Sequence, residues 1–366
     1  MPNHGGPLPT RRLGRSDLQI TPVGLGTWAI GGSRSEGYGA QDDADSIASI
    51  RRAVAAGVNW IDTAPIYGLG HSEEVVGRVL AGIPVAERPF IFTKCGLIPH
   101  PGRPHDRPQR ILTPASMRRE LEGSLRRLGV DRIDLYQCHR PDEIGTPVED
   151  SWGEMGRFIE EGKVRAAGVS NFDVRELAAY EAIRHIDSLQ PPFSLIRRTA
   201  ADEVAWCSAH DVGVLAYGPL AAGLLSDTFT AARASALPHD DWRSSDPEFQ
   251  GARLARNLKL RDTLAPIARA RETTTAAVAI AWLLAWPGVT AAAAGARHPD
   301  QVGGWEDAAR LELSVLDLET ITAAVERTGA GTGPVWAVNA SRQHQCSSSG
   351  PKGTSPHALN ATGPPP

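Results

Sequence analysis

The chain alternates between short apolar runs and longer segments with helical periodicity. Eight apolar runs predict strands, at residues 23–28, 59–64, 90–95, 133–139, 164–170, 188–193, 212–218 and 289–295. The segments between and after them predict helices, at residues 44–56, 72–80, 114–128, 147–161, 174–184, 203–210, 253–271, 275–285 and 299–309. Strands that alternate with helices pair in parallel through βαβ connections, and eight such repeats favour a closed (β/α)8 TIM barrel.

The same pattern predicts one folded domain with two irregular ends. We expect the barrel to span residues 11–328, after a flexible N-terminus at 1–10 and before a disordered tail at 329–366 that is rich in Gly, Ser and Pro. Residues 220–250 lack clean periodicity, and a long segment of this kind is typical of a lid over a ligand.

Composition narrows the classes of partner. With 38 basic and 42 acidic residues among 366, the net charge of -4 gives no reason to expect a nucleic acid or a membrane as a partner. The N-terminus has no apolar signal segment, and the four cysteines are far apart with no CxxC pair. We therefore expect a cytoplasmic protein with reduced thiols.

Four polar residues stand at or just after the ends of predicted strands. Asp62 and Tyr67 lie in NWIDTAPIYG, Lys94 in FIFTKC and His139 in IDLYQCH. A parallel barrel brings the carboxyl ends of its strands to one face, where active sites lie. Each residue also has an ordinary interpretation, as a loop cap, a packing phenol, a solvated lysine or a core histidine. Their occurrence on successive strand ends favours a common site.

These residue types suit proton transfer to a carbonyl group that is being reduced. A tyrosine is a weak acid, with an ordinary pKa of about 10, and a nearby ammonium favours its phenolate. Lys94 could supply that charge to Tyr67, making the phenol a better proton donor in reduction and a better base in oxidation. A buried lysine needs a counter-ion, for which Asp62 is the natural candidate. His139 could donate a hydrogen bond to the substrate oxygen as it becomes negative.

The motifs NWIDTAPIYG, FIFTKCG, YQCH and GVSNF, in this order, resemble those of the aldo-keto reductases. This is a family of barrel oxidoreductases that use a nicotinamide cofactor, mostly NADPH. The resemblance covers residues 11–327, and the RSSDPEFQ segment is most similar to the bacterial general-stress branch. It implies reduction of an aldehyde or ketone with NADPH/NADP+, with Tyr67 as the proton donor and Asp62, Lys94 and His139 as its partners. Trp28, Tyr67 and His139 would line the pocket for a small carbonyl substrate.

The resemblance also implies a set of cofactor contacts. Ser170, Asn171 and Gln190 match the partners of the carboxamide, and Tyr217 matches the residue that stacks under the nicotinamide ring. Arg297 is the candidate for the 2′-phosphate, Gln301 would face the adenine, and Arg243 would add a second phosphate contact. The remaining implied contacts are Gly218, Pro219, Leu220 and Gly223 along the pyrophosphate, together with Gly26, Thr27, Trp28, Asp62 and Gly295.

The chain departs from the family pattern at the adenine end. Gly304-Trp305 stands where many relatives have a Glu-Asn pair, and a lysine common after the preceding turn is replaced near Asp227-Thr228. Both departures bear on how strongly NADPH is preferred over NADH.

Two patterns are interpreted as structural. Residues 24–29 fit the dinucleotide fingerprint G-x-G-x-x-A, but no clean helix follows, so we interpret them as the first barrel strand and its loop. His100 and His105 lie in a proline-rich segment with no third ligand, so we expect a loop and no metal.

Two other functions remain open at this point. Lys94 on a barrel strand could form an imine in a Schiff-base lyase or aldolase. Alternatively, the protein could be a regulator that senses NADPH with little turnover.

Overall fold

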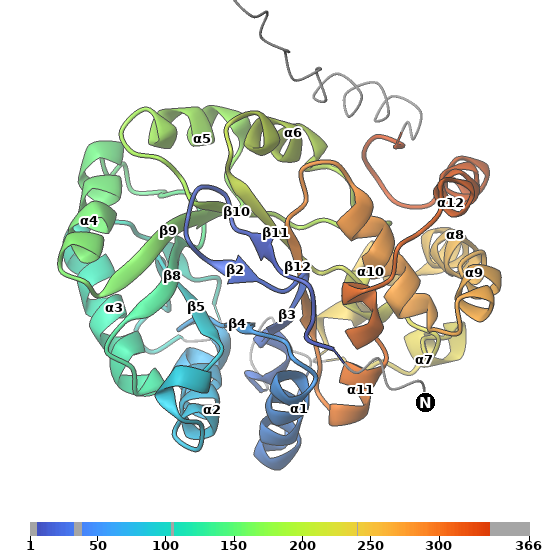
Figure 1. Ribbon diagram of the computed structural model, residues 1–366, viewed down its shortest axis with the longest axis horizontal. Helices are drawn as coiled ribbons and strands as arrows, with labels where there is room; N and C mark the ends of the chain where they lie inside the picture. The colour runs from blue at the N-terminus through green and yellow to red at the C-terminus, as the bar shows by residue number, and fades with distance from the viewer. Residues whose placement is uncertain (1–5, 33–38, 104–105, 240, 337–366) are drawn as a thin grey trace, which may run out of the picture.

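Eight parallel strands close into a barrel at the centre of the protein (Figure 1). The computed structural model describes residues 6–32, 39–103, 106–239 and 241–336. The barrel strands are β3 (Val23–Gly26), β4 (Trp60–Asp62), β5 (Phe90–Cys95), β8 (Ile133–Cys138), β9 (Val164–Ser170), β10 (Ser188–Gln190), β11 (Gly213–Tyr217) and β12 (Ala291–Gly295). Each predicted apolar run contains one of them, and β12 pairs with β3 to complete the ring. The predicted TIM barrel is confirmed.

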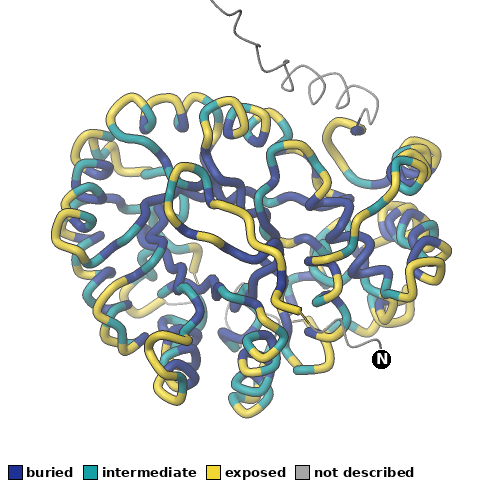
Figure 2. Tube along the Cα trace, viewed as in Figure 1, coloured by how far each residue is buried: buried dark blue, intermediate teal, exposed yellow. Residues whose placement is uncertain are grey.

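A ring of helices surrounds the barrel. They are α1 (Asp43–Ala55), α2 (His71–Leu80), α3 (Pro114–Leu128), α4 (Val148–Glu160), α5 (Val174–Glu181), α6 (Ala201–Ala209), α7 (Ala231–Ser235), α8 (Gly251–Asp262), α9 (Ala265–Ala270), α10 (Thr275–Ala285), α11 (Pro299–Gly303) and α12 (Val315–Thr328). Most of these helices bury one face and expose the other (Figure 2), whereas the short α7 has no buried residue. The most apolar helix, α10, is buried over most of its length.

A short hairpin closes the amino-terminal end of the barrel. Its strands are β1 (Arg11–Arg12) and β2 (Gln19–Ile20), and it lies across the barrel in Figure 1. Leu13, Leu18 and Ile20 are fully buried and pack with the inward-facing Trp60 and Phe92. The barrel interior is therefore apolar at this end. A second hairpin, of β6 (Leu97–Ile98) and β7 (Gln109–Arg110), follows β5 at the other end.

Several helices differ from the prediction. The predicted helix 253–271 is two helices, because Pro266 in the first turn of α9 cannot continue the hydrogen bonding of α8. The predicted helix 299–309 is α11 followed by the 3-10 turn η7 (Glu306–Ala309). The segment 220–250 contains the short helix α7 and the 3-10 turns η4 (Ala221–Gly223), η5 (Trp242–Ser244) and η6 (Pro247–Phe249). Three further 3-10 turns are η1 (Trp28–Ile30), η2 (Tyr67–Gly70) and η3 (Val85–Glu87).

The chain after residue 310 is more ordered than the sequence pattern predicted. Helix α12 was not expected, although the capping box of Ser314 and Asp317 marks its start. Residues 329–336 were assigned to the tail, but Ala330 and Trp336 are buried, and Arg198 binds the carbonyl of Pro334. The folded domain therefore extends to residue 336, and the rest of the predicted tail lies outside the described residues, as does Cys346.

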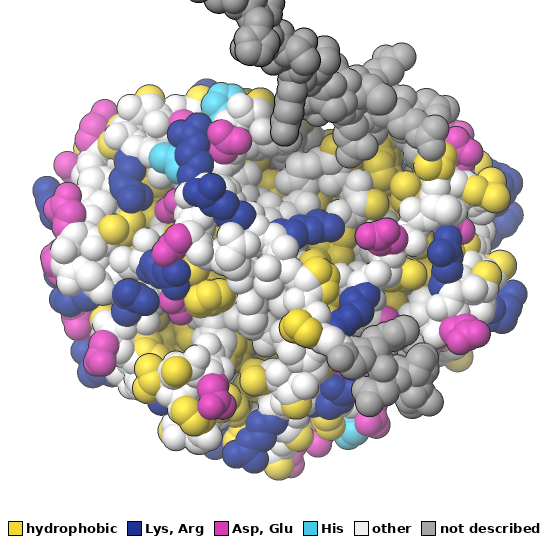
Figure 3. All heavy atoms as spheres, viewed as in Figure 1, with side chains coloured by type: hydrophobic (Ala, Val, Ile, Leu, Met, Phe, Trp, Pro, Cys, Tyr) yellow, Lys and Arg dark blue, Asp and Glu magenta, His cyan; other side chains and the backbone are white. Residues whose placement is uncertain are grey.

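The surface carries charges of both signs, interspersed over the face in Figure 3. None of the helices in the described ranges is both long and apolar enough to cross a bilayer. Three cysteines, Cys95, Cys138 and Cys207, are buried free thiols.

Candidate active site

A buried lysine and aspartate form the floor of the candidate site. Lys94 near the end of β5 donates a hydrogen bond to Asp62 at the end of β4, with 2.6 Å between Nζ and Oδ2. The exposed fractions of the two side chains are 0% and 5%. Burial lowers the pKa of Lys94, and the negative charge of Asp62 opposes this shift. The carboxylate thus favours the charged form of this lysine.

The phenol of Tyr67 contacts the ammonium of Lys94. The lysine Nζ is 3.3 Å from the phenol Oη and 3.0 Å from the carbonyl oxygen of Thr63. Tyr67 begins the turn η2, which depends on Gly68: its φ is 61°, and a Cβ there would collide with the carbonyl of Gly31. This close approach holds the phenol at the mouth of the barrel.

His139 completes the group from the residue after β8. Its ring lies edge-on to that of Tyr67, with 5.8 Å between ring centroids. Burial lowers the pKa of His139 well below its ordinary value, and the positive charges of Lys94 and Arg140 lower it further. The imidazole is consequently neutral at neutral pH and can offer one N–H to an oxygen above the phenol. The structure therefore brings together the four residues singled out from the sequence.

The second oxygen of Asp62 is bound from the opposite wall. Its Oδ1 accepts hydrogen bonds from Gln190 on β10, at 2.9 Å, and from Gln137 on β8, at 3.3 Å. Sequence reasoning assigned Gln190 to a cofactor and overlooked Gln137. The signal for Gln137 was available, because it is a polar residue inside the apolar run IDLYQC, two positions before His139 and so on the same face of the strand.

Three predicted carboxamide and ring contacts lie on the neighbouring strand ends. Tyr217 donates a hydrogen bond of 2.8 Å to Oδ1 of Asn171, whose Nδ2 donates to Ser170 and to the carbonyl of His139. Asn171 has a φ of 63°, a conformation that asparagine tolerates better than most residues. The amide of Asn171 is thus fixed between Tyr217 and the tetrad of Asp62, Tyr67, Lys94 and His139.

Comparison with known proteins identifies the family. The model of the aldo/keto reductase family matches residues 22–326. The chain is 34% identical over 313 residues to aldo-keto reductase YhdN of Bacillus subtilis (strain 168), covering 85% of this chain and 92% of that protein. It is 31% identical over 322 residues to the NADH-specific methylglyoxal reductase of Escherichia coli (strain K12), covering 84% and 94%.

A solved structure agrees with this match. The glycerol dehydrogenase AKR11B4 from Gluconobacter oxydans superposes with a TM-score of 0.79 at 36% identity, covering 89% of this chain and 98% of that one. The chain belongs to the aldo/keto reductase family. It is an oxidoreductase of the class that reduces carbonyl groups, and the curated relatives named above are bacterial.

In this aldo-keto reductase, Arg297 lies after β12 with its side chain held in place. Its Nε donates to Oε1 of Gln41 at 2.7 Å, and its backbone N–H donates to Oε1 of Gln301, also at 2.7 Å. Gln41 returns a hydrogen bond to the carbonyl of Arg297. Gln41 was not predicted to matter here. It connects the loop after β3 to the predicted phosphate-binding residue.

The departure at residues 304–305 has a structural reason. Trp305 is almost completely buried in the main hydrophobic core, and the carbonyl of Gly304 accepts a hydrogen bond from Thr274. This pair therefore belongs to the packing of the barrel wall.

The segment 220–250 contacts the turn after β3 through an aromatic pair. Trp242 stacks on Trp28, the first residue of the turn after β3, with 5.9 Å between ring centroids. The neighbouring Arg243 forms hydrogen bonds to both oxygens of Asp241 and to the carbonyl of Ala222. Those contacts hold the guanidinium in place, and the phosphate contact of Arg243 stays a prediction.

The remaining predicted contacts lie at strand ends and in one tight loop. Gly26, Thr27 and Gly295 are at or beside the ends of β3 and β12. After β11, Gly218, Ala221, Ala222 and Gly223 have positive φ angles, from 46° to 101°, and the loop with Pro219 and Leu220 is tightly folded.

The structure supports the interpretation of the glycine pattern at residues 24–29 as part of the barrel. Gly24 lies in β3, where a Cβ would collide with the indole of Trp60, so the glycine serves barrel packing. No group of three or more possible metal ligands occurs among the residues that the structure describes. His100 follows β6, and His105 lies outside those residues.

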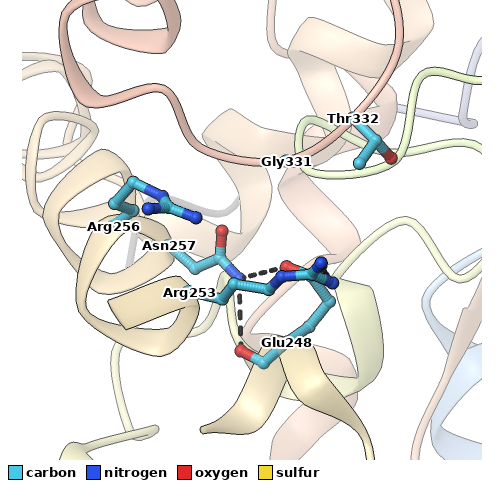
Figure 4. A pocket seen from close by; sticks show the side chains of 6 residues that line it. All are labelled: Glu248, Arg253, Arg256, Asn257, Gly331 and Thr332. Atoms are coloured by element: carbon cyan, nitrogen blue, oxygen red, sulfur yellow. Dashed lines mark hydrogen bonds and ion pairs between the residues drawn. The ribbon is translucent and has the colours of Figure 1, made fainter. Parts of the chain in front are cut away.

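A small pocket of about 130 Å³ lies away from the tetrad, between α8 and the segment after α12 (Figure 4). Asn257 at its base donates to the carboxylate and the carbonyl of Glu248. None of the four tetrad residues lines it.

Proposed function

We propose that the protein reduces an aldehyde or ketone to an alcohol with NADPH, reversibly, and that Tyr67 is the general acid. The observation that carries the proposal is the position of Lys94, whose ammonium contacts both Asp62 and the phenol oxygen of Tyr67. An ammonium at this distance stabilises the phenolate that remains after proton transfer.

The predicted roles of the other residues follow from the same geometry. The neutral His139 would donate a hydrogen bond to the carbonyl oxygen, which polarises the carbonyl and positions it beside Tyr67. Tyr67 then transfers its proton to that oxygen as negative charge develops. In the reverse direction, the phenolate accepts the proton of the alcohol. Asp62 keeps Lys94 charged in both directions.

The residues present suit a nicotinamide cofactor. Tyr217 offers an aromatic face beside Asn171 and Ser170, whose polar groups could bind a carboxamide. Arg297 offers a guanidinium that suits a phosphate. A bound reduced nicotinamide would supply the hydride that the side chains cannot. We propose NADPH over NADH because of Arg297, although the relative from Escherichia coli is named as NADH-specific.

The Schiff-base alternative finds no support in this geometry. Imine formation needs a neutral amine that a carbonyl carbon can reach. Lys94 is fully buried, and its three hydrogen-bond contacts, to Asp62, Thr63 and Tyr67, occupy the ammonium. A redox sensor with little turnover would use the same cofactor contacts, so a turnover measurement separates it from a reductase.

The test is a kinetic assay with both cofactors. NADPH and NADH oxidation would be followed with methylglyoxal, DL-glyceraldehyde and 4-nitrobenzaldehyde. We expect turnover with NADPH, and we expect Tyr67→Phe to lower kcat by about a hundredfold or more. Tyr180→Phe, which removes a buried phenol on α5, is the matched control and should retain activity. A Tyr67→Phe enzyme with wild-type turnover would show that the phenol is not the acid.

A further inference from the structure

Gln137 is an internal residue of the barrel that the tetrad does not include. It lies on β8 directly opposite Lys94 of β5 and two residues before His139. Its side chain is fully buried, and its amide nitrogen is 3.3 Å from Oδ1 of Asp62. It therefore contacts the catalytic carboxylate from below the mouth of the site.

The two oxygens of Asp62 have different partners. Oδ2 receives the ammonium of Lys94, whereas Oδ1 receives the two amides of Gln137 and Gln190. The amide nitrogens must face the carboxylate, because two oxygen acceptors would repel each other. The two amides therefore fix the orientation of Asp62 and stabilise its negative charge in a nearly dry environment.

Under the proposed function, the amide of Gln190 would bind the cofactor carboxamide as well as Asp62. If it binds the cofactor carboxamide, its contact with Asp62 weakens or is lost. Gln137 is then the remaining side-chain donor to Oδ1 among the described residues. Gln137 is suited to hold Asp62 while a ligand is bound, because its complete burial keeps it away from any ligand at the mouth of the barrel.

We propose that Gln137 is a positioning residue that holds Asp62 charged and aligned against Lys94 while the cofactor occupies the site. This inference rests on the proposed function, since it assigns a role in the same proton transfer. The residue does not touch the substrate or the cofactor. Its effect reaches Tyr67 through Asp62 and Lys94.

The neighbouring strand provides the space that Gln137 needs. Gln137, Gly168 and Ser188 are register partners across β8, β9 and β10. A Cβ at Gly168 would lie 3.2 Å from Cγ of Gln137 and would collide with the hydroxyl of Ser188. Ser188 is as buried as Gln137, and its hydroxyl has no hydrogen-bond partner within the part of the chain that the structure covers. It therefore gives a matched control in the same layer.

Other charged groups around Lys94 must be considered in any pH measurement. Those facing the lysine or its partners are Asp62 on β4, Tyr67 in η2, Glu73 on α2, His139 and Arg140 after β8, and Tyr217 on β11. Glu73 is already bound by Thr93 and Arg127. None of these groups is altered by substitution of Gln137, so a change in the pH profile can be assigned to the lost amide.

The experiment compares Gln137→Met, which keeps the volume and removes the amide, with Ser188→Ala. The kcat for oxidation of 4-nitrobenzyl alcohol with NADP+, and for reduction of 4-nitrobenzaldehyde with NADPH, is measured across pH. Without the amide, Asp62 is a weaker counter-ion, so Lys94 loses its charge at lower pH and the phenolate of Tyr67 is less stabilised. We expect kcat to fall about tenfold and the rising limb of the oxidation profile to move to higher pH by about 0.5 to 1 unit.

The controls separate the possible outcomes. A purely structural role would lower the stability of Gln137→Met but leave the pH midpoint unchanged, and Ser188→Ala should leave the midpoint unchanged in any case. If Gln137→Met does not fold, Gln137→Leu tests the same loss. An active wild type whose midpoint and kcat are retained in the folded variant would overturn the inference and leave the proposed function intact. A wild type that is inactive with these probes and with the carbonyls named above would overturn both.

Discussion

The Nζ atom of Lys94 lies 2.6 Å from Oδ2 of Asp62, and both side chains are almost completely removed from solvent. Removing one member of such a pair leaves the other charge buried without a counter-ion. We predict that Lys94→Met lowers the free energy of unfolding by about 3–5 kcal/mol and abolishes carbonyl reduction. Urea unfolding and the NADPH assay measure the two effects separately.

The matched control for this prediction is the double variant Lys94→Met/Asp62→Asn. It removes both charges and keeps an acceptor for the amides of Gln137 and Gln190, so much of the lost stability should return. Activity should not return, because no ammonium is left beside Tyr67. Recovery of activity in the double variant would contradict the role of Lys94.

The second prediction concerns cofactor preference. Arg297 is oriented by Gln41 and Gln301, and it is our candidate for the phosphate that distinguishes NADPH from NADH. We predict that Arg297→Leu raises the KM for NADPH by about tenfold or more and changes the KM for NADH by less than about twofold. Steady-state kinetics with both cofactors measures this difference.

Arg51→Leu is the control for this prediction, because Arg51 is an exposed arginine on α1. It should leave both KM values unchanged. Equal increases for NADPH and NADH in Arg297→Leu would show that Arg297 does not read the 2′-phosphate.

The third prediction concerns Glu120 on α3, whose carboxylate accepts a hydrogen bond from the backbone N–H of Gly96. Burial raises the pKa of Glu120 to about 8, although this hydrogen bond and that from Ser116 oppose the shift. Between its unfolded pKa of about 4.3 and its folded pKa, the folded protein binds a proton that the unfolded chain has released. Raising the pH through this window therefore lowers the free energy of unfolding.

Urea unfolding at about pH 5.5 and about pH 8.5 checks this sign, and the Glu120→Gln variant isolates it. The glutamine cannot release a proton, so its stability should fall less with pH than that of the wild type. Glu87→Gln, at an exposed position in the turn η3, should behave like the wild type. A Glu120→Gln protein with the same pH dependence as the wild type would contradict the prediction.

The barrel and the proximity of Asp62, Tyr67, Lys94 and His139 could be predicted from the sequence because both depend on local sequence signals. Each strand is a short apolar run, and Asp62, Lys94 and His139 stand at the ends of such runs. A parallel closed sheet then brings these ends together without any further information.

The features that escaped prediction depend on contacts between distant residues. The hairpin of β1 and β2 has two residues in each strand, too few for any periodicity to show. The role of Gln137 depends on Asp62, 75 positions earlier in the chain. The separation of α8 from α9 had a local signal in Pro266, which the helical pattern of the surrounding residues obscured.

Under the proposed function, the hairpin that carries Leu13, Leu18 and Ile20 would limit the route of proton exchange. It closes the amino-terminal end of the barrel with buried apolar side chains, which disfavour proton movement between Lys94 or Asp62 and solvent in that direction. If Tyr67 donates protons as proposed, they would be replaced from the opposite, carboxyl-terminal face of the barrel. Ligands that fill this face would also separate Tyr67 from bulk water. Reprotonation of the phenol would then wait until the product leaves. Turnover would therefore depend on water returning to this face of the barrel after each reaction.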